Sequence, residues 1–188
     1  GISIFILGLL PGLPKIPFFA LAGALLLAII FERLPAERRA VGVVHLLDYL
    51  RLIANSNSDE GDEALRSVIN IPNRYIGRRF MSDLDGFQSS SEMHLYEKLK
   101  SMPVDLPYIR KNVREFIQFI DPLIEDSANQ QPAELIQLIR SALDYDRVVV
   151  DSDLPAPDDP KIENLNQLQM AAARFNDIGS FLDYTETF

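Results

Sequence analysis

The chain has 188 residues, a formal net charge of −9 and 47% apolar residues, which is enough for one domain with a sizeable core. It contains no cysteine, which excludes a disulfide framework and thiolate chemistry. The acidic balance argues against a free-standing nucleic-acid binder of the usual kind, because such proteins gain affinity mainly by neutralising phosphates.

The N-terminal part of the chain is apolar. Residues 1–31 carry a single charge, Lys15, and the apolar run at 18–31 is shorter than the about 20 residues that a spanning helix needs. Three arginines follow it, as is typical of the cytoplasmic flank of a membrane segment. We expect an apolar helical hairpin and basic linker over 1–40, with residues 2–31 as a candidate membrane contact that tethers a cytoplasmic chain to the inner membrane. A helix buried in a larger protein is the open alternative.

The motif LLPGLPKIPFFAL at residues 9–21 resembles the segment before the last membrane helix of FlhA-type export-gate proteins of flagellar and type III secretion systems. The resemblance covers about residues 1–40. It implies an alternative function, in which the chain is a membrane-anchored helical protein or export-gate fragment whose remaining part docks partner proteins.

From Val43 onward, apolar residues recur at helical spacing. The predicted fold is all-α, a helical bundle of about seven to nine helices with the apolar N-terminal hairpin, and residues 41–188 form one helical domain. A kink or helix restart is expected at Pro122, and a short extended piece at 148–150 inside an acidic loop. The expected helices cover residues 43–55, 62–70, 75–84, 92–101 (capped by Ser90 or Ser91), 107–124, 132–143, 161–175 and 178–184.

Residues 69–79 combine an unusual backbone signal with concentrated positive charge. Pro72 disfavours helix at the residue before it, and Gly77 permits a positive φ or the close approach of another backbone. Between residues 64 and 82 the chain has four arginines and no acidic residue. A turn that presents backbone N–H and guanidinium groups can bind phosphate. The alternative is an ordinary connection between helices with solvated arginines.

Three blocks, YLRLIAN at 49–55, VINIPNRYIG at 68–77 and IENLNQL at 162–168, resemble the helical 2B subdomain of UvrD/Rep/PcrA-type superfamily 1 DNA helicases, over about residues 43–188. In that family a Pro-x-Arg-Gly-Ile-Gly turn contacts the backbone of duplex DNA. This sequence matches at Pro72, Arg74, Ile76 and Gly77 and has Tyr75 where the family usually has glycine, so that a tyrosine hydroxyl becomes an additional donor to phosphate.

The resemblance implies a non-catalytic accessory subdomain that acts with helicase motor domains in cis or trans. The implied contacts with duplex DNA are Arg74, Tyr75, Ile76, Gly77, Arg78 and Arg79. This hypothesis requires that the guanidinium groups are not held in intramolecular carboxylate pairs and that the glycine amide does not turn inward. A plain helical interaction module without a DNA role is a third interpretation.

Catalytic signatures are missing from the sequence. No glycine is followed by lysine, so the P-loop needed for ATP hydrolysis is absent, although the parent protein implied by the resemblance would be an ATP-dependent DNA helicase. We therefore expect no catalytic residue, metal ligand or cofactor on this chain. His45 is expected to be a structural histidine and His94 a surface residue of a helix. The acidic residues at 144–153 are expected to form a solvated loop.

Overall fold

The computed structural model describes residues 41–87, 93–151 and 159–186. Within these ranges the chain forms nine α-helices and no strand, which confirms the predicted all-α fold. The helices are α3 (Val41–Asn55), α4 (Asp59–Val68), α5 (Arg78–Asp85), α6 (Leu95–Ser101), α7 (Pro107–Glu125), α8 (Pro132–Ala142), α9 (Tyr145–Val150), α10 (Pro160–Ala172) and α11 (Ile178–Glu186).

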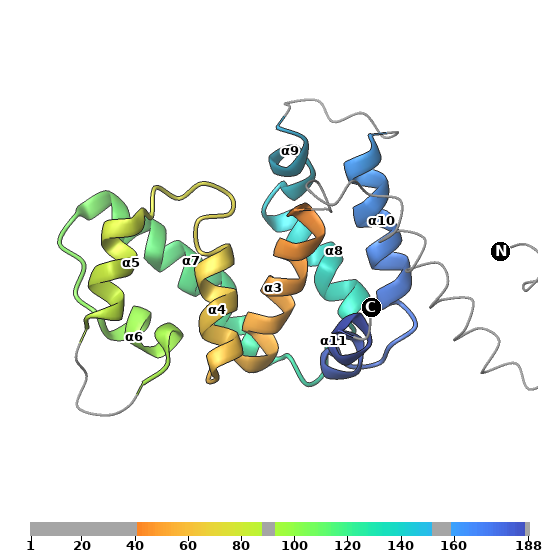
Figure 1. Ribbon diagram of the computed structural model, residues 1–188, viewed down its shortest axis with the longest axis horizontal. Helices are drawn as coiled ribbons and strands as arrows, with labels where there is room; N and C mark the ends of the chain where they lie inside the picture. The colour runs from red at the N-terminus through yellow and green to blue at the C-terminus, as the bar shows by residue number, and fades with distance from the viewer. Residues whose placement is uncertain (1–40, 88–92, 152–158, 187–188) are drawn as a thin grey trace, which may run out of the picture.

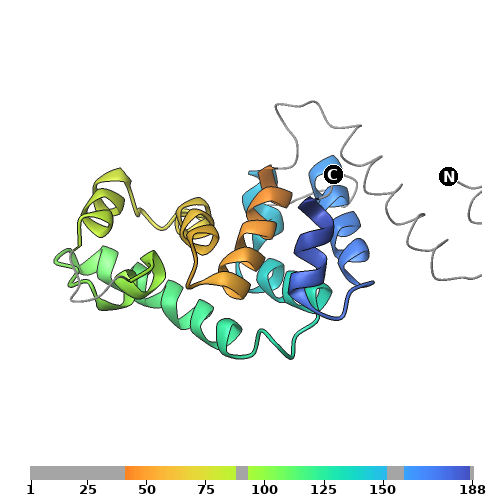
Figure 2. The same ribbon diagram turned by 60° about the horizontal axis from the view of Figure 1, so that its bottom comes forward.

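Helix α3 lies in the middle of the elongated molecule (Figures 1 and 2). Helices α4, α5 and α6 lie on one side of it and α8 to α11 on the other, while α7 extends from α5 and α6 to below α3. Helix α3 contacts α4, α7, α8, α10 and α11. One hydrophobic core joins the two sides, and its largest fully buried side chains are Tyr49, Tyr96, Tyr145, Phe116 and Phe181.

The connection between α3 and α4 is tight because of local sequence features. The Ser58 hydroxyl accepts a hydrogen bond from the Gly61 amide at 3.1 Å and donates one to the Asn55 carbonyl at 2.8 Å. Three acidic residues occupy the first turn of α4, where the helix dipole favours negative charge. A Cβ at Gly61 would lie 2.0 Å from the Asn55 carbonyl oxygen, so only glycine lets the two helices approach this closely.

The sequence predicts a kink or a helix restart at Pro122, and of these two the restart does not occur. Helix α7 runs as one helix from Pro107 to Glu125, with Pro107 in its first turn and Pro122 inside it. Pro122 lies only three residues before the end of the helix, so the missing N–H affects the last turns alone. The buried face of the helix, which includes Phe116, Ile120 and Leu123, continues past the proline.

The extended piece expected at 148–150 is also wrong, because these residues end helix α9. Tyr145 is fully buried, and its hydroxyl donates to the Gly42 carbonyl at 2.9 Å. Asp144 and Asp151 bound the helix with positive φ values of 47° and 56°. A Cβ at Gly42 would lie 2.8 Å from Val149, so α9 packs closely on the start of α3. Tertiary contact thus overrides the β-branched composition of this segment.

Other expectations differ in their boundaries or concern residues that the structure does not describe. Helix α4 begins at Asp59, three residues earlier than expected, and α5 begins at Arg78, three residues later. The apolar hairpin at 1–40, the caps at 90–91 and Asp153 lie outside the described residues. Among the helices that are described, none is both long and apolar enough to span a membrane.

Candidate nucleic-acid interface

The segment 69–77 that joins α4 to α5 is the candidate site. It leaves the end of α4 as a non-helical loop and returns to the start of α5 (Figure 1). Its peptide bond between Ile71 and Pro72 is cis. The buried side chain of Ile76 anchors the loop in the core.

Arg74 points into the molecule. Its Nη1 lies 2.7 Å from the Ile71 carbonyl oxygen, and three further carbonyl oxygens lie 3.1–3.3 Å away. The last carbonyls of a helix have no partner within the helix, so this guanidinium acts as a cap for the end of α4 and for the turn. The four carbonyl groups belong to Val68, Ile69, Ile71 and Pro72.

Two aromatic side chains from other helices complete the surroundings of Arg74. Tyr49 on α3 accepts from Arg74 Nη2 at 3.3 Å and donates to the Ile71 carbonyl. Burial raises the pKa of the Tyr49 hydroxyl, and the charge of Arg74 opposes that shift. Phe116 on α7 lies below the guanidinium, with its ring centroid 5.0 Å from Cζ. Arg74 therefore links α3, α4 and α7 through the turn.

Two asparagines fix the backbone of the turn. Asn70 Oδ1 accepts hydrogen bonds from the amides of Arg74 at 2.8 Å and Ile76 at 3.1 Å. Asn112 on α7 donates from Nδ2 to the Arg74 carbonyl at 2.7 Å. The loop is thereby held by its own side chains and by two neighbouring helices.

The outer side of the turn carries Tyr75, Gly77, Arg78 and Arg79, all exposed. Gly77 has an ordinary extended backbone, with φ −91° and ψ −179°, and a Cβ added there would meet no atom within 4 Å. Gly77 precedes α5 as its N-cap residue and offers no capping side chain. In the described residues, the side chains of Arg78 and Arg79 form neither a hydrogen bond nor an ion pair.

The six predicted contact residues therefore separate into two groups. Ile76, which is buried, and Arg74, which is half-buried and turned toward the carbonyl groups, shape the turn, whereas the other four are exposed. None of the three arginines of the turn pairs with a carboxylate in the described part of the chain. The fourth arginine of the stretch, Arg66, does form such a pair, with Asp85 at 2.6 and 3.0 Å. This pair joins α4 to α5, and the hydrogen bond from Arg66 lowers the pKa of Asp85.

Sequence reasoning missed the residues that support the turn. Tyr49 and Asn70 lie inside the blocks that carry the helicase resemblance, so their place in those blocks could have marked them as candidates. Asn112 and Phe116 gave no such signal, because they belong to a helix about 40 residues further along the chain.

A second group of polar side chains joins α4 to α6. His94 Nδ1 lies 3.3 Å from Asp62 Oδ2, while Asp62 Oδ1 accepts from the Leu95 amide at 2.7 Å. Asp59 completes a group whose ligand-type atoms lie within 4.8 Å of one another. The sequence predicts His94 as a surface residue of a helix; its side chain is 38% exposed at the N-cap of α6, and folding places Asp62, 32 positions away, beside it. The contacts present identify this group as a link between the starts of α4 and α6.

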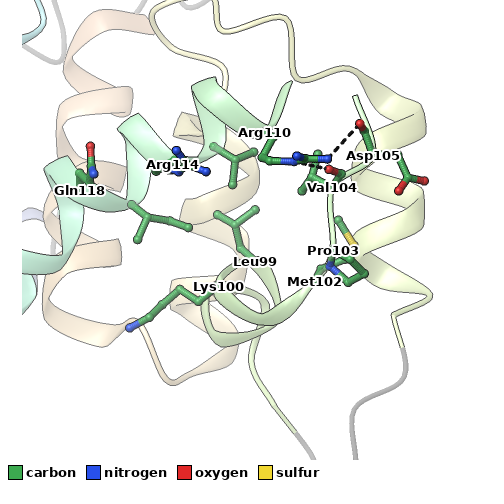
Figure 3. A pocket seen from close by; sticks show the side chains of 11 residues that line it. Leu99, Lys100, Met102, Pro103, Val104, Asp105, Arg110, Arg114 and Gln118 are labelled. Carbon is green, nitrogen blue, oxygen red and sulfur yellow. Dashed lines mark hydrogen bonds between the residues drawn. The ribbon is translucent and has the colours of Figure 1, made fainter. Parts of the chain in front are cut away.

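An open pocket of about 430 Å³ lies between α6 and α7 (Figure 3). Its lining includes the apolar side chains of Leu99 and Val113 and the charged side chain of Arg114. Arg110 donates from Nε to the Val104 carbonyl at 2.7 Å and so ties the loop before α7 to that helix. The residues lining this pocket come from α6, α7 and their connection, not from the turn.

Comparisons with known proteins found relatives among DNA helicases. A probable DNA helicase II homologue of Rickettsia conorii is 23% identical over 144 residues, which covers 74% of this chain and 21% of the relative. The ATP-dependent DNA helicase PcrA of Staphylococcus epidermidis, in each of two strains, is 27% identical over 126 residues, which covers 65% of this chain and 16% of the relative.

The chain thus spans only about a fifth of the length of these relatives. No family model matches it, and no solved structure matches it. At low identity and over part of its length, the chain is related to the superfamily of UvrD/PcrA-type DNA helicases.

Proposed function

We propose that residues 41–188 form a non-catalytic accessory domain of a UvrD/PcrA-type helicase, corresponding to its 2B subdomain, and that the turn at 69–79 holds duplex DNA by its backbone. The observation that carries this proposal is the pair Arg78 and Arg79. Both are exposed at the start of α5, and neither has a partner in the described part of an acidic chain.

The arrangement suits a phosphate. The first N–H groups of a helix have no acceptor within the helix, and Gly77 leaves them uncovered. Two guanidinium groups beside them supply charge and hydrogen-bond donors. Such contacts position DNA without reading its sequence.

Arg74 and Ile76 serve the contact indirectly. The hydrogen bonds of Arg74 to four carbonyl groups and the burial of Ile76 hold the loop so that Gly77, Arg78 and Arg79 come together on its outer side. A rigid scaffold of this kind reduces the entropy lost when a ligand binds. Ion-pairing of Arg66 with Asp85 keeps α5 in place relative to α4.

The proposed partners are duplex DNA and helicase motor domains that hydrolyse ATP. The similarity to proteins named as DNA helicases supports this role. The chain itself lacks a P-loop, so the motor must reside on other residues or another polypeptide.

The test is the salt dependence of binding to a short duplex, measured by fluorescence anisotropy for the wild type and for Arg78→Ala/Arg79→Ala. Each phosphate contact adds about 0.9 to the slope of log K against log salt, so the double variant should lower the slope by about two. The matched control is Arg147→Ala/Lys161→Ala, which removes two exposed basic side chains from α9 and α10 on the other side of the molecule (Figure 1).

The control should bind with an unchanged slope. An equal loss of slope in both double variants would mean that overall charge, not the turn, attracts DNA. An unchanged slope in Arg78→Ala/Arg79→Ala would overturn the proposal.

A further inference from the structure

Tyr75 is the most exposed large apolar side chain in the described residues, at 71% exposure. Three of the other tyrosines, Tyr49, Tyr96 and Tyr145, are buried, and the side chain of Tyr75 makes no hydrogen bond or ring contact with a described residue. A tyrosine ring left in water at this position contributes little to the stability of the fold.

The backbone of Tyr75 is held in an unfavourable conformation. Its φ is 57°, in the left-handed region that bulky residues rarely adopt. The Asn73 side chain accepts from the Tyr75 amide at 2.9 Å, and the neighbouring residues Arg74 and Ile76 are anchored inside. The ring is therefore presented outward from a fixed base, and strain of this kind is commonly retained at functional sites.

The exposed ring precedes two unpaired, exposed cations in the same short turn, and this combination suggests a ligand. Arg78 and Arg79 follow Tyr75 by three and four residues and suit a phosphate, and an aromatic ring next to a phosphate site can stack on a nucleobase. Within a continuous duplex both faces of each base are covered by neighbouring bases. Only an unpaired base or the last pair of a duplex offers an open face.

We propose that Tyr75 is a stacking platform for a nucleobase with an uncovered face, which gives the turn a preference for DNA that contains an unpaired base or an end. This inference rests on the proposed DNA contact and names the form of DNA that the contact selects. Hydrogen bonding of the tyrosine hydroxyl to phosphate is the competing role, and it would act on any duplex.

The experiment compares four DNA probes of one sequence. The first is a blunt duplex, and the second carries a single unpaired adenine at its centre. The third replaces that adenine by an abasic spacer, which keeps the same backbone distortion but removes the base. The fourth is a closed circular duplex without ends. The difference in affinity between it and the blunt duplex measures binding to an end, separately from binding to an internal unpaired base.

Three proteins are compared by fluorescence anisotropy at one salt concentration. They are the wild type, Tyr75→Phe, which keeps the ring, and Tyr75→Asn, which removes the ring and tolerates a positive φ. We expect the wild type and Tyr75→Phe to bind the adenine bulge about tenfold more tightly than the abasic bulge, the size of one base–aromatic stack. Tyr75→Asn should bind both bulges equally.

Equal binding of the two bulges by the wild type, or loss of the preference in Tyr75→Phe, would overturn the stacking proposal. Either result would concern stacking alone if Arg78→Ala/Arg79→Ala still lowers the affinity for every probe, because the proposed phosphate contact would then still be supported. If no probe responds to that double variant, the proposed DNA contact itself fails, and the stacking proposal fails with it.

Discussion

Arg74 Nη2 lies 3.3 Å from the hydroxyl oxygen of Tyr49, and both side chains donate to the carbonyl of Ile71. One carbonyl in the turn thus receives a guanidinium from its own loop and a phenol from α3. This shared acceptor fixes the direction in which the loop leaves α4, and with it the side on which Arg78 and Arg79 are exposed.

Arg74→Ala should lower the free energy of unfolding by about 2–3 kcal/mol, because the four carbonyl groups that accept from its guanidinium lose a charged donor. Arg74→Lys should recover little of this loss, since an ammonium group lacks the planar fork of donors. Urea unfolding followed by circular dichroism measures the effect. Arg79→Ala is the matched control and should change stability by less than about 0.5 kcal/mol.

Tyr49→Phe should cost about 1–2 kcal/mol through the loss of its donor to Ile71. The double variant Tyr49→Phe/Arg74→Ala should be less destabilised than the sum of the two single variants, because both act on one carbonyl. Additive effects in this double-mutant cycle would show that the two side chains act independently.

Tyr75→Asn should raise the free energy of unfolding by up to about 1 kcal/mol, because asparagine occupies the left-handed region at lower cost than tyrosine. The exposed ring loses little burial in this change. Tyr108→Asn serves as the control, since Tyr108 is also exposed but lies in the first turn of α7. A stability gain of the same size in both variants would contradict the explanation from backbone strain.

Gly61→Ala and Gly77→Ala should differ sharply in their effect on the stability of the fold. The first places a methyl group 2.0 Å from the Asn55 carbonyl oxygen and should destabilise the protein by about 3 kcal/mol or more. The second meets no atom within 4 Å and should cost only about 1 kcal/mol or less, because alanine is a poorer N-cap residue than glycine but causes no clash. Thermal unfolding of both variants measures the contrast.

Gly77→Ala has a second use, because its fold should remain intact. If phosphate approaches the backbone at this residue, the added methyl group should weaken duplex binding. Duplex affinity equal to that of the wild type would place the phosphate away from Gly77 and on the arginine side chains alone.

His45 should make stability depend on pH near neutrality. Burial lowers the pKa of His45 below its ordinary value of 6.5, although Asp48 opposes the shift. Between the lowered pKa and 6.5 the unfolded chain binds more protons than the folded chain, so the free energy of unfolding falls as the pH falls through this window. Above pH 6.5 the stability that His45 contributes as a neutral side chain is fully present.

Urea unfolding of the wild type and of His45→Gln, at pH values on either side of 6.5, measures this dependence. The variant should lose part of the slope with pH that the wild type shows. Identical slopes would mean that His45 titrates alike in the folded and unfolded chains.

The sequence alone determined the fold class and the place of the candidate site. Apolar residues at helical spacing dictate which face of each helix is buried, so every helix from α3 to α11 except α9 follows from local pattern, with shifts of a few residues at the ends. Pro72 and the arginine-rich stretch likewise marked the turn, because a proline restricts its neighbour wherever it lies in a fold.

Tertiary structure decided what each residue of that turn does. Arg74 and Arg78 are indistinguishable by type, yet one is drawn inward by carbonyls near Tyr49 and Phe116 and the other is left in water. The same holds for α9, where a hydroxyl contact with a residue 103 positions away outweighs a local preference for strand. Such contacts join residues that lie far apart in the chain. The direction of a side chain depends on where its distant partners pack, and the local sequence pattern carries no information about that packing.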